Sequence, residues 1–152
     1  MDIAPPELLL RPVRGARACT DCETGPVSDP DAPAIDRLLV ECRRRIDRVE
    51  PADLAREMAA GALVVDLRPS EQRSADGPLP GAVVIDRNVL EWRLDPTSPH
   101  RLPGNDDPDR RVVLVCNEGY GSTLAAYTLV QLGLRDVADL VGGFQAWSAL
   151  GR

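Results

Sequence analysis

The stretch Val112–Ala126, VVLVCNEGYGSTLAA, contains the clearest structural pattern in the chain. An apolar run leads to Cys116, a loop with two glycines follows, and an apolar segment begins near Ser122. Apolar runs without polar alternation are typical of strands that are buried on both faces of a parallel sheet. We therefore expect a strand at 111–116 and a helix at 123–133, with the glycine loop at the carboxyl end of the strand.

Strands and helices alternate along the rest of the chain. Short apolar segments predict further strands at 62–67, 82–86 and 137–141. Helices are expected at 51–61, which has proline near its start and glycine at its end, and at 144–150. This alternation predicts an α/β fold in which helices cover both faces of a parallel sheet.

The N-terminal part of the chain differs in composition from the rest. Residues 1–32 contain five prolines and show no helical or strand period, so we expect a flexible tail followed by one domain at 33–152. The segment PAIDRLLVECRRRI predicts a helix, because its apolar residues recur on one face. These residues are Ile35, Leu38, Leu39, Cys42 and Ile46. Cys42 is interpreted as a core residue of this apolar stripe.

Length and charge limit the class of protein. A chain of 152 residues suits one domain with a single core. The net charge is −6, which argues against nucleic acids and anionic membranes as partners. All 18 basic residues are Arg, so neither a lysine Schiff base nor a P-loop lysine is available. No apolar run reaches the roughly 18 residues of a transmembrane helix, and no signal peptide is recognised, so we expect a cytoplasmic protein.

Cys116 occupies the position where parallel sheets bind ligands, beyond the carboxyl end of a strand. Gly119 and Gly121 allow the loop to turn its N–H groups toward one point, and the following helix adds free N–H groups of its own. A helix end is worth only about 0.3–1 kcal/mol to a nearby anion, so a reactive thiolate needs the loop donors as well. We interpret Cys116 as a nucleophile rather than as a structural cysteine.

The spacing Cys116-x-x-Gly119-x-x-Ser122-x-x-Ala125-Ala126 resembles the active-site loop of the rhodanese-like sulfurtransferases. Three further segments resemble this family, in the same order along the chain. VVDLRPSEQ (64–72) is similar to its Asp-x-Arg segment, GPLPGAVVI (77–85) to its Pro-Gly-Ala turn, and LVGGFQAW (140–147) to its Gly-Gly-aromatic-x-x-Trp segment. The resemblance extends over roughly residues 46–151.

The resemblance implies a rhodanese-like five-stranded parallel sheet with helices on both faces, and a single-domain sulfurtransferase. Cys116 would take a sulfane sulfur from thiosulfate or a low-molecular-weight persulfide and become a persulfide. A thiol, or cyanide, would then accept the sulfur. The resemblance implies no metal and no organic cofactor. The substrate sulfur would be bound by the backbone N–H groups of Asn117, Glu118, Gly119, Tyr120, Gly121 and Ser122.

The loop departs from the family pattern in its charge. It contains no basic residue: Gly121 stands where Arg is common, and Glu118 adds a negative charge. Because thiosulfate is a dianion, we expect it to be a poor donor for this loop. Arg73, Arg87 and Arg93 are candidates to supply positive charge from neighbouring loops, although each alone is typical of a surface arginine.

Two interpretations stay open for the pair that resembles the family's Asp-x-Arg segment. Asp66 and Arg68 form either a structural ion pair, or a pair in which Arg68 also lines the substrate pocket. Tyr120, between two glycines, is expected to be partly exposed and to shape the acceptor site. His100, the only histidine, is a weak candidate for a base beside Cys116.

Cys19 and Cys22 form a C-x-x-C pair, a spacing that zinc and redox sites share. We interpret them as unrelated tail cysteines, with metal binding or sulfur relay to Cys116 as the alternatives.

Two other functions are compatible with the pattern. A non-catalytic rhodanese-like module that binds a partner protein is favoured by the absence of basic residues from the loop. A cysteine phosphatase or arsenate reductase is disfavoured, because it needs a basic residue six positions after the cysteine, where this chain has Ser122.

Overall fold

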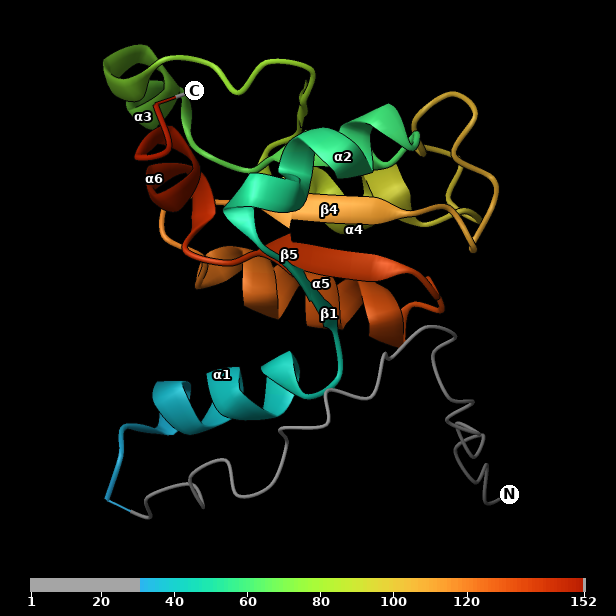
Figure 1. Ribbon diagram of the computed structural model, residues 1–152. Helices are drawn as coiled ribbons and strands as arrows, with labels where there is room; N and C mark the ends of the chain where they lie inside the picture. Colours follow the sequence, from blue (N-terminus) through green and yellow to red (C-terminus); the bar gives the residue numbers. More distant parts are fainter. Residues whose placement is uncertain (1–30, 152) are drawn as a thin grey trace.

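The computed structural model describes residues 31–151, which form one five-stranded sheet surrounded by helices (Figure 1). The strand order is β1-β5-β4-β2-β3, and every adjacent pair is parallel. The strands are β1 (Asp47–Val49), β2 (Leu63–Asp66), β3 (Val83–Val84), β4 (Val112–Val115) and β5 (Val137–Leu140). This arrangement confirms the expected α/β class and the five-stranded parallel sheet.

Helices cover both faces of the sheet, also as expected (Figure 1). The helices α4 and α5 pack on one face, and α2 and α6 pack on the other. The α-helices are α1 (Ala34–Arg43), α2 (Leu54–Ala59), α3 (Ser70–Asp76), α4 (Leu90–Leu94), α5 (Gly121–Gln131) and α6 (Gly143–Ser148). Single 3-10 turns precede α2, at Pro51–Asp53, and α4, at Arg87–Val89.

Strand β4 is apolar without alternation because both of its faces pack into a core. Val112 and Leu114 point into the core beneath α4 and α5, whereas Val113 and Val115 point into the core beneath α2 and α6. All residues of β2, β4 and β5 are buried. Because both faces of these central strands are covered, each position along them requires a side chain that tolerates burial.

The structure corrects the prediction for the first helix. Helix α1 ends at Arg43, and of the predicted apolar face only Leu39 and Cys42 are buried. Ile35 and Leu38 are 51% and 47% exposed, because the amino-terminal part of α1 extends beyond α5, the helix on which α1 packs (Figure 1). Cys42 is 1% exposed, which confirms its interpretation as a core residue.

Three short elements were not predicted from the sequence. Strand β1 has only one buried residue, Val49, and it forms because its backbone pairs with β5 at the edge of the sheet. Helix α3 has no buried residue, and α4 is a single short helix after a 3-10 turn. The predicted tail falls almost entirely outside the described residues, as do Cys19 and Cys22.

Candidate active site

The loop between β4 and α5 holds Cys116 at the carboxyl edge of the sheet. The Sγ atom of Cys116 accepts a hydrogen bond from the Gly119 N–H at 3.2 Å. It also lies 3.1 Å from the Oγ atom of Ser122, whose side chain is fully buried. Donors aimed at the sulfur in this way stabilise negative charge that develops there during a reaction.

A shallow pocket of about 430 Å³ opens over this cysteine. Cys116 lines it together with Gln72, Asn117, Glu118, Tyr120 and Gly121. Five of the predicted loop positions therefore share one pocket, while Gly119 and Ser122 contact the sulfur. Gln72 comes from α3 and was missed, because that helix carries no apolar periodicity. Tyr120 is 54% exposed, as its position between two glycines led us to expect.

Helix α6 fixes the direction of the loop backbone. The N–H of Phe144 donates to the carbonyl of Cys116 at 2.8 Å, and the N–H of Gln145 donates to the carbonyl of Asn117 at 3.0 Å. Since the C=O and N–H of a trans peptide point in opposite directions, these bonds turn the next N–H groups away from α6. The same loop geometry was expected from its glycines, but the sequence did not identify α6 as the element that holds it.

The Gly-Gly turn before α6 permits this close contact. Gly143 has φ 62°, and a Cβ atom at this position would lie 2.5 Å from the carbonyl oxygen of Cys116. On the other side of the contact, a Cβ atom at Gly119 would lie 2.9 Å from the backbone nitrogen of Gly142. Both distances are shorter than real Cβ atoms allow, so the two segments can pack this closely only with glycine at positions 119 and 143.

Arg68 is buried beside the site and does not line the pocket. Its guanidinium binds Asp66 through Nη2 and Oδ2 at 2.8 Å, and Nη2 also donates to the carbonyl of Gly77 at 3.0 Å. This is the geometry of the structural ion pair. Through it Arg68 connects the end of β2 to the end of α3.

The other candidate cations have partners elsewhere. Arg73 donates to the carbonyl of Arg68, Arg87 pairs with Glu91 at 2.7 Å, and Arg93 donates to the carbonyl of His100 at 2.9 Å. None of these side chains, and not His100, lines the pocket over Cys116. The cation that approaches the loop is Arg43 of α1, which the sequence analysis missed: its Nη2 lies 3.4 Å from the carbonyl oxygen of Gly119.

Two features are absent from residues 31–151. No group of three or more His, Cys, Asp and Glu side chains is placed to hold a metal ion. No helix in this part of the chain is long and apolar enough to cross a membrane.

Comparison with known proteins agrees with the fold. The model of the Rhodanese-like domain family matches residues 50–150. The thiosulfate sulfurtransferase GlpE of Pseudomonas entomophila is 33% identical over 100 residues, a match that covers 66% of this chain and 83% of GlpE. The adenylyltransferase and sulfurtransferase UBA4 of Candida albicans is 31% identical over 86 residues, which are 57% of this chain and 19% of UBA4.

Solved structures of other proteins share this fold. The Rhodopseudomonas palustris protein RPA3614, described as of unknown function and a possible tyrosine phosphatase, superposes with a TM-score of 0.70 at 32% identity, covering 84% of this chain and 97% of its own. The human single-domain sulfurtransferase TSTD1 superposes with a TM-score of 0.55 at 23% identity, covering 67% of this chain and 95% of its own, and supports the fold alone. The family match and the GlpE relatives show that this chain belongs to the rhodanese-like domain family and is a rhodanese-like sulfurtransferase.

Proposed function

We propose that this sulfurtransferase carries a sulfane sulfur as a persulfide on Cys116 and delivers it to a thiol acceptor. The observation that supports this most directly is the position of the Cys116 sulfur. It lines an open pocket and contacts the Gly119 N–H and the Ser122 hydroxyl. A nucleophilic sulfur needs both access to the donor and stabilisation of the charge that it carries.

The reaction takes two steps. In the first, the Cys116 thiolate attacks the outer sulfur of the donor, a new S–S bond forms, and the donor's own S–S bond breaks. Thiosulfate would leave as sulfite, and a persulfide would leave as its thiolate. In the second step, a thiol or cyanide attacks the outer sulfur of the persulfide, and Cys116 departs as the thiolate, ready for another cycle. Sulfur and charge balance in each step without a metal or an external oxidant.

The loop would stabilise the persulfide intermediate through its backbone. Helix α6 holds the carbonyls of Cys116 and Asn117, which leaves the N–H groups on the opposite side of the loop. We propose that the N–H groups from Asn117 to Ser122 bind the outer sulfur of the persulfide, as an anion-binding nest does. Tyr120, exposed at the pocket, would shape the site for the acceptor.

The charge of the pocket bears on the choice of donor. The matched GlpE relatives are named thiosulfate sulfurtransferases, but Glu118 places a carboxylate on the pocket of this chain. A dianion meets more repulsion from that carboxylate than a singly charged persulfide does. We therefore propose that a low-molecular-weight persulfide is the better donor.

The test is a sulfur-transfer assay with each donor, using cyanide or a dithiol as acceptor. Cys116→Ser should abolish transfer from both donors, and Cys42→Ser should retain it, because Cys42 is buried away from the pocket. Glutathione persulfide should give a higher kcat/KM than thiosulfate. Equal transfer by wild type and Cys116→Ser would contradict the role of Cys116, and a higher kcat/KM for thiosulfate would contradict the donor assignment.

Three other expectations stay predictions: binding of a partner protein, a cytoplasmic location, and the absence of phosphatase activity. RPA3614 is described as a possible tyrosine phosphatase, so the last is worth a direct assay. This chain has Ser122 where a cysteine phosphatase needs a basic residue, and we expect no hydrolysis of phosphotyrosine above the rate of Cys116→Ser.

A further inference from the structure

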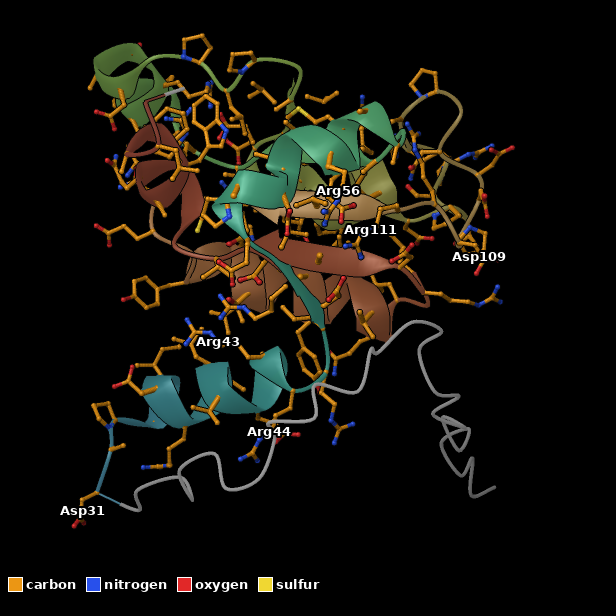
Figure 2. The ribbon with its side chains drawn as sticks, viewed as in Figure 1. Asp31, Arg43, Arg44, Arg56, Asp109 and Arg111 are labelled. Atoms are coloured by element: carbon orange, nitrogen blue, oxygen red, sulfur yellow. The ribbon has the colours of Figure 1, made fainter. Side chains whose placement is uncertain are left out.

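Helix α1 precedes the segment that the family model matches, yet it reaches the active-site loop. The match covers residues 50–150, whereas α1 ends at Arg43. The Nη2 atom of Arg43 lies 3.4 Å from the carbonyl oxygen of Gly119, and its guanidinium carbon lies 5.8 Å from the centre of the Tyr120 ring. Figure 2 shows Arg43 directed from α1 toward the body of the domain, and Arg44 directed away from it. The helix thus contributes one cation to the loop.

The charge of Arg43 is not neutralised within residues 31–151. No carboxylate there forms an ion pair with it, and its Nε atom is buried without a hydrogen-bond partner in the same part of the chain. Its neighbours on α1 differ: Arg44 and Arg45 both pair with Glu41 in exposed positions. Arg43 therefore directs an uncompensated positive charge at the Gly119 carbonyl and the Tyr120 ring.

The hydroxyl of Thr123 has two possible acceptors but only one proton, which supports Arg43 as the donor to the Gly119 carbonyl. The Oγ1 atom of Thr123 lies within hydrogen-bond distance of two acceptors, the Gly119 carbonyl at 3.0 Å and the carboxylate of Asp139. Asp139 is fully buried in an ion pair with Arg48, at 2.9 Å, and so accepts rather than donates. One threonine hydroxyl has one proton. If it goes to Asp139, the Gly119 carbonyl depends on Arg43.

Gly119 connects this contact to the catalytic sulfur. Its N–H donates to the Cys116 Sγ atom, while its C=O accepts from Arg43. A group that holds the Gly119 carbonyl outward also fixes the N–H of the next residue in the opposite direction, because the peptide is planar and trans. A cation at the carbonyl strengthens that N–H as a donor to an anion, since hydrogen bonds in a chain polarise one another.

We propose that Arg43 is a positioning residue for sulfur transfer: it holds the Gly119 carbonyl and supplies, from outside residues 117–122, the positive charge that the loop lacks. This inference rests on the proposed function, in which the Cys116 sulfur carries negative charge. The positive charge of Arg43 stabilises the negative charge that the Cys116 sulfur carries during transfer, and it partly offsets Glu118 when an anionic donor enters.

The test compares two positions on the same helix, 43 and 44, with the same change in charge at each. Arg43→Gln removes the contact with Gly119, and Arg44→Gln removes an exposed charge from the next residue. Arg43→Met is a second neutral variant, whose apolar side chain suits the buried part of the site. Gln, Met and Arg have similar helix propensities, so α1 should form in all three.

Two measurements are made on each folded variant. The first is the rate of Cys116 alkylation by iodoacetamide near pH 6 divided by the rate near pH 9, which reports the fraction of thiolate. The second is kcat/KM for thiosulfate and for glutathione persulfide. All three variants keep every other charged or titratable group near the loop, so a difference between positions 43 and 44 reports Arg43. Those groups are Glu118, Tyr120, Asp66, Arg68, Asp76, Asp139 and Arg48.

Arg43→Gln and Arg43→Met should lower the alkylation ratio about fivefold, and kcat/KM for thiosulfate about tenfold, the loss expected for a hydrogen bond to a charged group. The loss should be smaller with the persulfide, because its reacting group carries one negative charge rather than two. Arg44→Gln should match wild type in both measurements. The proposal is overturned if either neutral variant at position 43 folds and matches Arg44→Gln in both. Alkylation does not require sulfur transfer, so it tests Arg43 even if wild type transfers no sulfur.

Discussion

The guanidinium carbon of Arg68 lies 3.4 Å from the centre of the Phe144 ring, and this contact joins the end of β2 to α6. Phe144 in turn donates its N–H to the carbonyl of Cys116. The buried pair formed by Asp66 and Arg68 therefore supports the catalytic loop from behind, through α6. Segments 64–72 and 140–147, which are far apart in the sequence, serve the same loop for this reason.

Replacement of Arg68 by Ala should lower the free energy of unfolding of the domain. The substitution leaves the carboxylate of Asp66 buried, at 1% exposure, without its cation. Breaking a buried pair in this way typically costs about 3–5 kcal/mol. Urea unfolding measures the loss, and Arg56→Ala is the control, since Arg56 pairs with Asp53 at 75% side-chain exposure (Figure 2). A similar free energy of unfolding for both variants would contradict the role assigned to Arg68.

Gly143→Ala should disable the site, because its Cβ atom would collide with the carbonyl of Cys116. We expect kcat/KM for sulfur transfer to fall by about a hundredfold, as the loop that orients the sulfur must move. Gly133→Ala is the matched control: Gly133 also has a positive φ of 99°, but nothing lies within 4 Å of its Cβ position. Its cost should be about 1–2 kcal/mol of backbone strain with little loss of kcat. Equal losses of kcat would show that the Gly143 contact does not position the loop.

Arg111 holds the amino-terminal edge of the sheet, opposite the site (Figure 2). It binds Asp47, Glu57 and Asp136 at 2.7, 3.0 and 2.8 Å. Burial alone would lower the pKa of Arg111, but the hydrogen bonds to Glu57, Asp47 and Asp136 raise it above its ordinary value. The network is thus formed by a charged arginine at every pH at which the protein is folded.

Arg111→Met should lower the free energy of unfolding by about 1–3 kcal/mol, because three carboxylates lose one shared, partly buried cation. Arg135→Met is the control, since Arg135 pairs with Asp109 and both side chains are 63% exposed. Thermal unfolding of the two variants at low salt gives the comparison. A loss at Arg135 as large as that at Arg111 would count against the network.

Cys42 and Cys116 should differ in their reactivity toward iodoacetamide. Burial raises the pKa of the Cys42 thiol, and the negative charge of Glu41 raises it further. Cys42 therefore stays protonated to higher pH than an ordinary thiol, and any stability that it contributes is lost as pH rises through its folded-state pKa. In a Cys19→Ser/Cys22→Ser background near pH 8, iodoacetamide should label Cys116 first and Cys42 only after unfolding in urea. Peptide mapping by mass spectrometry would show the order, and early labelling of Cys42 would contradict its burial.

The sequence predicted the central part of the fold well, because its signals there are strong. Strands β2, β4 and β5 are buried throughout and apolar except for Asp66 and Asp139, and α5 follows the glycine loop. Strand β1 and helix α3 were missed, since β1 has one buried residue and α3 has none. Their positions follow from pairing with β5 and from packing beside the pocket, which local patterns do not reveal.

For the candidate site, too, the sequence identified one part and not the other. Loop residues 116–122 are contiguous in the sequence, so one motif identifies them together. Gln72 and Arg43 reach the loop from helices that are distant in the chain, and the sequence carries no sign of either contact. The missing charge of the loop was apparent from the sequence. Arg73, Arg87 and Arg93 are the candidates that the sequence offers for this charge, but their partners lie elsewhere in the structure.

Sulfur transfer through Cys116 is tested most directly by the intact mass of the protein after incubation with glutathione persulfide and, separately, with thiosulfate. Wild type should gain one sulfur atom, cyanide should remove it, and Cys116→Ser should gain none. The Cys19→Ser/Cys22→Ser variant should gain sulfur as wild type does. A protein that gains no sulfur from either donor, or gains it equally without Cys116, would contradict the central claim.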